Sequence, residues 1–360
     1  MHAAPTYTLR QLGQSLWLDN ITRALLDSGT LKRYIDTMSV TGLTSNPTIF
    51  DHAISNSADY DEDIHRLSHD GLSTEAVFFD LAVHDLRRAA DLFAPIHACT
   101  GTVDGFVSLE VSPLLAYETD ATVKQAILLH NKARRDNLFI KIPGTPEGLP
   151  AIEQAIFEGV PVNVTLLFSP TQYEAAADAY LRGLERRVAN GRPPDTRSVA
   201  SLFVSRWDRA VTDRVEPPLR NTLGLAIGAQ CYAAYRAMLE SDRFQRLANT
   251  GARPQRLLFA STGTKDKAAS DTLYISGLAA PNTINTMPEE TLLAFLDHGA
   301  VTSVLPADGG GSSSVLAAHT AAGIDLVALA TQLQQDGAKS FVASWTNLLA
   351  AIETKCKALA

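Results

Sequence analysis

Lys141 is the residue whose surroundings most clearly indicate chemistry. Most of the nine lysines lie in polar, helical or loop contexts, whereas Lys141 stands in the apolar run Leu138–Ile142. Lysine is seldom fully buried without a partner, and removal from water disfavours its charged form. An uncharged amine is what adds to a carbonyl carbon, so this context indicates a nucleophile that forms a Schiff base. The alternative is a structural lysine that forms an ion pair with Glu110 or Asp19.

Other polar side chains stand at the ends of apolar runs. Carboxyl groups occupy two such places, at Asp19 and at Glu110. Each has a simpler explanation, because Asp is a favoured N-cap of a following helix and a lone Glu can face water at a sheet edge. Their shared placement points to a functional site. The same placement is found for Asn46, Asn163, Thr165, Ser201 and Arg206.

The runs that carry these residues have the length and composition of β-strands, and segments with helical spacing of apolar residues separate them. We expect strands at Ser15–Asp19, Thr41–Ser45, Val103–Val111, Leu138–Ile142, Val162–Phe168, Val199–Val204, Arg256–Ala260 and Thr283–Thr286. We expect helices at Leu25–Ile35, Thr74–Phe93, Thr122–Ala133, Pro170–Ala189, Leu219–Leu247, Pro288–His298 and Ser314–Ala321.

Eight strands alternating with helices predict a parallel α/β sheet, and the number eight favours a (β/α)8 TIM barrel. An open, doubly wound sheet is the second architecture, although no GxGxxG motif follows the first strand. We expect a single domain over residues 1–360, with an N-terminal arm at about 1–12 and C-terminal helices at 326–360 that pack on the barrel. Barrel enzymes build their sites at the C-terminal ends of the strands, which is where the polar residues fall.

The composition argues against several classes of partner. The net charge is −8 without a long run of Lys or Arg, so we expect neither a nucleic acid nor a membrane as partner. Cys99, Cys231 and Cys356 lie far apart, which favours a reduced, cytoplasmic protein. His65 and His69 stand four residues apart in a charged segment without an HExxH motif, so we expect no metal site.

Five motifs follow one another along the chain: Trp17–Arg23, Thr41–Phe50, Ile140–Thr145, Asn163–Ser169 and Ser201–Arg206. In type and order they resemble the motifs of the transaldolase family. The resemblance runs from about Leu16 to the end of the chain, and Asp271–Tyr274 and Asn285–Pro288 resemble the longer bacterial branch of the family.

The resemblance implies an enzyme that needs no metal or organic cofactor. Its substrates would be sugar phosphates: fructose 6-phosphate or sedoheptulose 7-phosphate would donate a dihydroxyacetone unit to glyceraldehyde 3-phosphate or erythrose 4-phosphate. By the same resemblance, Lys141 forms the Schiff base and Asp19 exchanges the proton of the substrate C4 hydroxyl. Glu110 and Thr165 hold a water that relays protons. The oligomeric state is not fixed by the resemblance, and a homo-oligomer is one alternative.

The family pattern also assigns residues to the rest of the substrate. Asn46, Asn163 and Ser201 would bind hydroxyl groups of the three-carbon unit. Arg206 would bind the phosphate as a bidentate donor.

Two positions bear on which member of the family this chain resembles. The enterobacterial branch has an Arg after the seventh strand as a second phosphate contact, and here Lys265 or the backbone amides around Gly263 take that place. Aldolase members carry Gln where Glu110 stands and Tyr where Phe203 stands, which makes Phe203 a specificity residue. A fructose-6-phosphate aldolase is therefore the first alternative function. A barrel that binds sugar phosphates without catalysis is the second.

Overall fold

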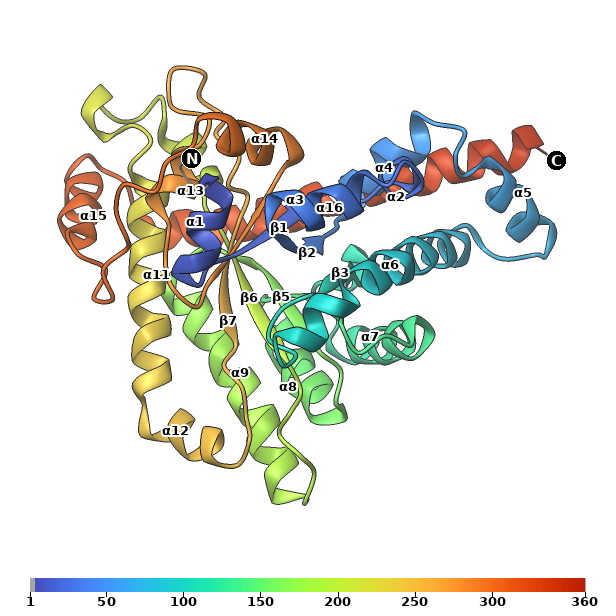
Figure 1. Cartoon of the computed structure of the whole chain (residues 1–360), viewed down its shortest axis with the longest axis horizontal. Coiled ribbons are helices and arrows are strands. Elements are labelled where there is room, and N and C mark those ends of the chain that lie inside the picture. The colour runs from blue at the N-terminus through green and yellow to red at the C-terminus, as the bar shows by residue number, and fades with distance from the viewer. Residues whose placement is uncertain (1–3, 360) are drawn as a thin grey trace.

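The computed structural model describes residues 4–359. Eight parallel strands lie in the order β2-β1-β8-β7-β6-β5-β4-β3, with helices around them (Figure 1). The expected (β/α)8 barrel is thus confirmed. The strands are β1 (Ser15–Asp19), β2 (Val40–Thr44), β3 (Val107–Glu110), β4 (Leu138–Pro143), β5 (Val162–Leu167), β6 (Ser198–Phe203), β7 (Arg256–Ala260) and β8 (Ile284–Met287).

The first and last members of that order, β2 and β3, meet through backbone hydrogen bonds and nearly close the barrel. Gly105 N donates to Thr41 O at 2.9 Å, and Leu43 N donates to Phe106 O at 2.9 Å. The strand expected at Val103–Val111 is wrong at its start, because β3 begins at Val107. The chain before it turns sharply, with φ of 81° at Gly105, which strand geometry excludes.

The helices follow the expected alternation, with two corrections. The single helix expected at Leu25–Ile35 is two helices, since Gly29 adopts a left-handed φ of 73° between them. The helix expected at Leu219–Leu247 is also two, because Ser241 is extended and its side chain accepts from Phe244 N as the N-cap of the second.

The helices, several of them without an expected counterpart, are α1 (Pro5–Leu12), α2 (Arg23–Asp27), α3 (Thr30–Met38), α4 (Pro47–Ser55), α5 (Asp61–His69), α6 (Thr74–Cys99), α7 (Thr119–Ala133), α8 (Gly148–Glu158), α9 (Pro170–Ala189), α10 (Ser205–Val211), α11 (Leu223–Glu240), α12 (Asp242–Asn249), α13 (Leu273–Gly277), α14 (Glu289–His298), α15 (Ser312–Ala321) and α16 (Leu326–Leu359), with short 3-10 turns at Pro113–Leu115 and Pro217–Leu219.

The C-terminal helix α16 crosses much of the molecule. It packs on α4, α5 and α6 and also reaches β5, and Figure 1 shows it running from the strands out along α4. Trp345, Leu348 and Ile352 are buried on its inner face. Within residues 4–359 no single helix is long and apolar enough to cross a membrane, although α15 and α16, which meet at a bend of 92°, together have the length and composition to do so.

An aromatic layer fills the middle of the barrel. Phe106 and Phe139 stack with ring centroids 4.1 Å apart, and Trp17 lies 6.2 Å from Phe139. Gly42 makes room for this layer, because a Cβ there would lie 2.4 Å from Trp17 Nε1. Side chains two residues apart on a strand share a face, so Asp19 points into the interior beyond Trp17. The layer thus supports the end of the barrel where the strands terminate.

Candidate active site

A cavity of about 600 Å³ opens where the barrel strands end. Side chains from β1, β4, β5 and β6 point into it, together with residues from α10 and α16. Glu110 and Asn163 do not line the cavity. Each lies behind a residue that does, Glu110 behind Lys141 and Asn163 behind Ser201. The other residues expected at the site all line it: Asp19, Asn46, Lys141, Thr165, Ser201, Phe203, Arg206 and Lys265.

Lys141 is held inside the barrel by two oxygen acceptors. Its ammonium group donates to Ser45 O at 2.9 Å and lies 3.2 Å from Glu110 Oε2. The side chain is 6% exposed, and the ring of Phe341 from α16 lies 6.0 Å from Nζ. The ion pair that the structural alternative required is therefore present with Glu110, but Lys141 also lines the cavity.

Glu110 and Thr165 both carry buried oxygen atoms that lack a hydrogen-bond partner in the described chain. These atoms are Thr165 Oγ1 and Glu110 Oε1. Burial raises the pKa of Glu110 above its ordinary value, although the charge and the hydrogen bond of Lys141 oppose that rise. Buried polar atoms are normally paired, so this pair of residues has the capacity to bind another polar group.

Asp19 stands at the end of β1 and keeps part of its surface open to the cavity. Its Oδ1 accepts a hydrogen bond from Thr44 Oγ1 at 2.7 Å. Burial raises the pKa of Asp19 above its ordinary value, and Lys141, Thr44 and Lys265 partly oppose this effect. The N-cap explanation for Asp19 is wrong, because Thr22 caps α2. Its carboxyl group is therefore available for proton exchange.

The small polar residues form a chain of hydrogen bonds across β3, β5 and β6. Ser201 Oγ donates to Asn163 Oδ1 at 2.7 Å, and Asn163 Nδ2 donates to Ser108 Oγ at 3.1 Å. Asn46 has a local role as well, since its Oδ1 accepts from Ile49 N and caps α4. The capping bond leaves the amide nitrogen of Asn46 for other contacts.

A group of cationic side chains lines one side of the cavity. The Arg206 guanidinium stacks over the ring of Phe203 at 4.8 Å, and it forms no ion pair with a carboxylate of residues 4–359. Burial lowers the pKa of Arg206, and the nearby charge of Arg209 lowers it further. Arginine stays charged regardless, and an unpaired guanidinium matches an anion such as phosphate. Lys265 is exposed at the rim of the same cavity.

Sequence reasoning missed several lining residues. Arg209 follows Arg206 by three positions, a spacing that places both on one face of α10 and could have identified it. His52 on α4 gave no such signal. Ser340 and Phe341 come from α16, in the C-terminal segment for which we expected only packing on the barrel.

The end of β5 has an irregularity that α16 supports. The pairing of β5 with β6 shifts register between Val164 and Leu167, and Leu166 has φ of 59°. Gln334 of α16 donates 3.0 Å hydrogen bonds to Leu166 O and to Gly144 O. Bulges of this kind re-aim side chains near sites, and here the bulge follows Thr165 directly.

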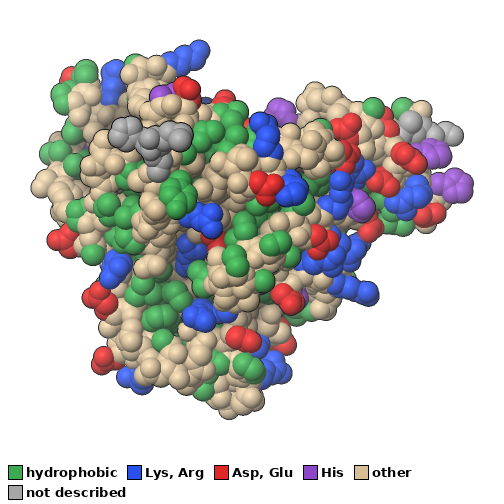
Figure 2. Space-filling view, in the orientation of Figure 1, with side chains coloured by type: hydrophobic (Ala, Val, Ile, Leu, Met, Phe, Trp, Pro, Cys, Tyr) green, Lys and Arg blue, Asp and Glu red, His purple; other side chains and the backbone are tan. Residues whose placement is uncertain are grey.

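His65 and His69 lie on α5, and neither lines this cavity. Both side chains are exposed, and Figure 2 shows histidine side chains at the end of the molecule that α5 forms. Across residues 4–359, no cluster of three or more His, Cys, Asp or Glu side chains has the arrangement of a metal site.

Known proteins resemble this chain over nearly its whole length. The family described as "Transaldolase/Fructose-6-phosphate aldolase" matches residues 16–352. A protein named "Transaldolase" from Saccharopolyspora erythraea is 45% identical, covering 95% of this chain and 94% of its own length. A protein of the same name from Mycobacterium marinum is 44% identical, covering 98% of this chain and 97% of its own length. Another, from an Arthrobacter species, is 42% identical, covering 97% of this chain and 96% of its own length.

Proposed function

The chain belongs to the transaldolase/fructose-6-phosphate aldolase family, and from that premise we propose that Lys141 is the residue that forms a Schiff base with a ketose phosphate. Family membership makes the chain an enzyme, a transferase of the transaldolase type acting on sugar phosphates, so the non-catalytic alternative is set aside. The observation that carries the assignment of Lys141 is its placement: a buried amine that lines the cavity and is held 3.2 Å from Glu110.

Imine formation requires Lys141 to lose protons and the substrate oxygen to gain them. Glu110 Oε2 lies beside Nζ and can accept the first proton, which leaves the amine free to add to the C2 carbonyl carbon. The carbinolamine oxygen then leaves as water. Thr165 and Glu110 support this step because their free oxygens offer a place for a water that relays protons.

Carbon–carbon cleavage then uses Asp19 as the base. Asp19 takes the proton of the C4 hydroxyl, the C3–C4 bond breaks, and its electron pair moves into the protonated imine. An aldose phosphate leaves as the aldehyde, and Lys141 keeps the dihydroxyacetone unit as an enamine. The raised pKa of Asp19 supports this role, because a stronger base accepts the proton more readily. Addition of the enamine to a second aldose phosphate, followed by hydrolysis, completes the transfer.

The remaining residues expected at the site hold the substrate in our proposal. Asn46, Asn163 and Ser201 bind the hydroxyls of the three-carbon unit. In support, Asn46 and Ser201 line the cavity, and Ser201 is hydrogen-bonded to Asn163 behind it. Arg206 binds the phosphate, with Lys265 as a second cation at the rim.

We propose in addition a cytoplasmic location and one domain over residues 1–360, of which 1–3 and 360 lie outside the described residues. Assembly into a homo-oligomer stays a prediction, and light scattering of the purified protein would test it by measuring the molar mass.

Borohydride trapping tests the assignment of Lys141. Fructose 6-phosphate and borohydride should add one reduced three-carbon unit to Lys141, located by mass spectrometry of peptides. Lys355 is a matched control, because it has the same kinds of partner as Lys141 but does not line the cavity. Its ammonium group donates to the backbone carbonyl of Ser57 at 2.7 Å and to the carboxylate of Asp61. Lys355→Ala should keep the label and Lys141→Ala should lose it. A label on any other lysine would refute the assignment.

The alternative of a fructose-6-phosphate aldolase is tested in the same reaction mixture. A transferase passes the enamine to glyceraldehyde 3-phosphate, whereas an aldolase protonates it and releases dihydroxyacetone. Phe203 lines the cavity and has no hydroxyl to donate, which supports transfer. Release of free dihydroxyacetone as fast as transfer would favour the aldolase.

A further inference from the structure

A second cavity, of about 520 Å³, lies at the opposite end of the barrel, where the strands begin. Its wall includes Ser15, Ser198 and Arg256, which are the first residues of β1, β6 and β7. The aromatic layer that contains Trp17 and Phe139 lies between this cavity and the catalytic one, since β1 runs from Ser15 through Trp17 to Asp19. The two cavities are therefore separate sites.

The second cavity is strongly cationic. Its charged lining comprises Arg10, Arg197, Arg253 and Arg256 against a single carboxylate, that of Asp104. The Asp104 carboxylate is already engaged, because it accepts hydrogen bonds from Ser15 Oγ and from Trp17 Nε1. In the described part of the chain none of the four arginines forms an ion pair with a carboxylate. Such an excess of unpaired guanidinium groups attracts an anion.

One of the four arginines has a structural explanation. Arg256 Nη2 donates to Ser15 Oγ at 2.7 Å and to Thr283 O at 2.8 Å, and its side chain is 8% exposed. These contacts join β7, β1 and the segment before β8. Arg256 therefore contributes charge to the cavity while its hydrogen bonds serve the barrel.

Arg197 has no comparable explanation. Its Nη2 donates to Thr102 Oγ1, but its Nη1 is buried without a hydrogen-bond partner within residues 4–359. A buried donor left unsatisfied is costly, and a guanidinium more so than a neutral group. Burial lowers the pKa of Arg197, and the neighbouring charge of Arg253 acts in the same direction. A bound anion would satisfy Nη1 and offset both effects.

Apolar side chains form much of the remaining wall, together with neutral polar ones such as Thr41 and Asn282. Phe106, Phe139 and Tyr235 line the interior, and Val103 lies among the lining residues with 43% of its surface exposed. A cavity of this volume falls within the range that holds small organic ligands, for which apolar walls with a few placed polar groups are usual. An inorganic ion alone would leave these walls uncovered.

We propose that this cavity binds a small organic phosphate. The phosphate group contacts the guanidinium groups of Arg197 and Arg253, because a guanidinium presents paired N–H donors that match phosphate oxygens. The organic part of the ligand lies against the Phe106 side of the cavity. This site is independent of the proposed catalytic function.

Calorimetric titration with phenyl phosphate tests this site. Arg206→Gln is the background, because it removes the phosphate contact of the catalytic cavity. In that background we expect one bound phenyl phosphate with half-saturation below about 1 mM. Arg253→Gln, a change at an exposed side chain, should weaken binding at least about tenfold and leave turnover of the otherwise unchanged enzyme intact. Arg197→Gln should weaken binding at least as much.

Controls separate this site from general attraction to a cationic protein. Arg246 on α12 is exposed and lines neither cavity, so Arg246→Gln should leave binding unchanged. Benzoate and inorganic phosphate should each bind more weakly than phenyl phosphate, since each lacks one half of the recognised group. The proposal is overturned if Arg206→Gln alone abolishes binding, or if Arg253→Gln and Arg246→Gln behave alike. Equal affinity for benzoate would overturn the phosphate class.

Discussion

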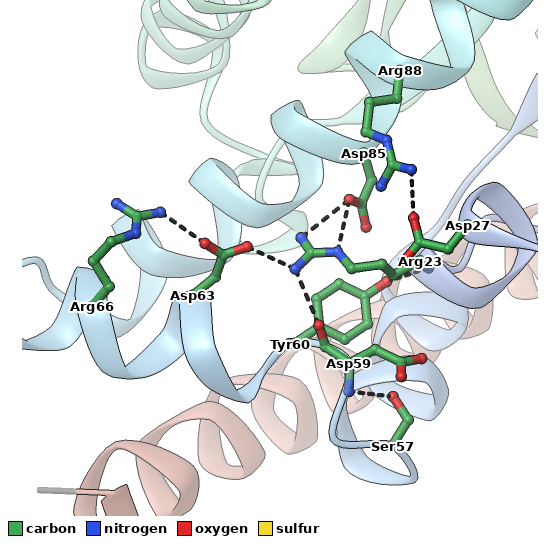
Figure 3. Close-up of polar contacts among 9 residues, drawn as sticks. All are labelled: Arg23, Asp27, Ser57, Asp59, Tyr60, Asp63, Arg66, Asp85 and Arg88. Atoms are coloured by element: carbon green, nitrogen blue, oxygen red, sulfur yellow. Dashed lines mark hydrogen bonds and ion pairs between the residues drawn. The ribbon is translucent and has the colours of Figure 1, made fainter.

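Arg23 and Lys141 are both cations removed from water, and their partners surround them differently. Around Arg23 the guanidinium contacts Asp85 at 3.1 Å, Asp63 at 2.7 Å and Asp59 O at 3.1 Å (Figure 3). It also stacks over the ring of Tyr60 at 4.5 Å. Burial disfavours the charge, but the two carboxylates outweigh burial and raise the pKa of Arg23. This cluster ties α2 to α5 and α6.

Both clusters contain buried oxygens that lack a hydrogen-bond partner among the described residues, Asp85 Oδ2 beside Arg23 and Thr165 Oγ1 and Glu110 Oε1 around Lys141. In the Lys141 cluster Arg206 also lacks a carboxylate. For Asp19 and Glu110, burial outweighs the neighbouring cation and raises the pKa of each carboxyl group. A buried charge alone therefore does not distinguish a site from a structural network. An unpaired polar atom on a residue that lines a cavity does, because a substrate can complete it. Thr165 lines the catalytic cavity, whereas Asp85 lines neither of the two cavities.

Exchanging each cation for an apolar residue of similar length should separate the two roles most clearly. Lys141→Met should lower kcat by at least about 10⁴-fold, because no amine remains to form the imine. The variant should remain folded although Glu110 loses its cationic partner, because burial already raises the pKa of Glu110 and its carboxyl group can take up a proton instead. Activity assays and thermal melts of the purified variant measure both effects. Retention of even a hundredth of the wild-type kcat would contradict the comparison.

Arg23→Met should act on stability and spare the chemistry. It leaves Asp85, whose side chain is 0% exposed, without its cationic partner, which typically costs about 3–5 kcal/mol. Urea unfolding measures the free energy of unfolding, and the folded fraction should keep the wild-type kcat. Combining the change with Asp85→Leu should recover part of the loss. If kcat fell while stability held, the Arg23 cluster would belong to the site.

Arg206→Gln should affect phosphorylated substrates selectively. Loss of a charge-assisted contact of about 1.5–3 kcal/mol raises KM for fructose 6-phosphate by about 10- to 150-fold. Turnover of unphosphorylated dihydroxyacetone as donor should change little, and Lys265→Ala should show a weaker form of the same selectivity. Steady-state kinetics on both donors decide this. Equal losses on the two donors would make Arg206 structural, in the manner of Arg23.

Much of the site could be predicted because its residues obey strand periodicity. Lys141, Thr165 and Ser201 stand near the ends of β4, β5 and β6, and parallel barrel strands present those ends at one rim. The strands Ser15–Asp19 and Arg256–Ala260 have the expected bounds. A run of buried apolar residues with a polar end is a local signal, and local signals are what a sequence displays directly.

The contributions of α16 could not be predicted in that way. Gln334 and Phe341 reach the site from the C-terminal helix, across separations such as the 190 residues between Gln334 and Gly144. Contacts of that range depend on how one helix crosses the barrel, which periodicity within the helix does not encode. The register shift after Val164 is likewise set by pairing with β6 and by Gln334, and no glycine marks it.

Phe203→Tyr would place a proton donor in the cavity beside Arg206. A donor near the enamine carbon shortens the lifetime of the enamine, so release of dihydroxyacetone from fructose 6-phosphate should rise about tenfold. Transfer to glyceraldehyde 3-phosphate should fall in parallel. Both products are measured in one coupled assay. An unchanged ratio of release to transfer would show that Phe203 does not set specificity.

The smallest expected effect is on stability, and it has opposite signs at Asp19, beside Lys141, and at Asp63, beside Arg23. The folded-state pKa of Asp19 is raised above the ordinary value of 3.8, so its contribution to stability is lost as pH rises through the folded value. Asp19→Asn removes this loss and should stabilise the protein by about 1 kcal/mol near pH 7, at the expense of activity. The gain should shrink as pH falls toward 3.8.

Asp63 provides the matched comparison. Burial tends to raise its pKa, but hydrogen bonds from Arg66 and Arg23 outweigh burial and lower it below 3.8. Its contribution to stability is therefore present at higher pH and is lost as pH falls through the folded value. Asp63→Asn should destabilise the protein near neutral pH by about 1 kcal/mol, again with a difference that shrinks in acid. Urea unfolding from about pH 7 to about pH 3 measures both variants. Two changes of the same sign at neutral pH would mean that the opposite pKa shifts of Asp19 and Asp63 are not expressed in the stability of the protein.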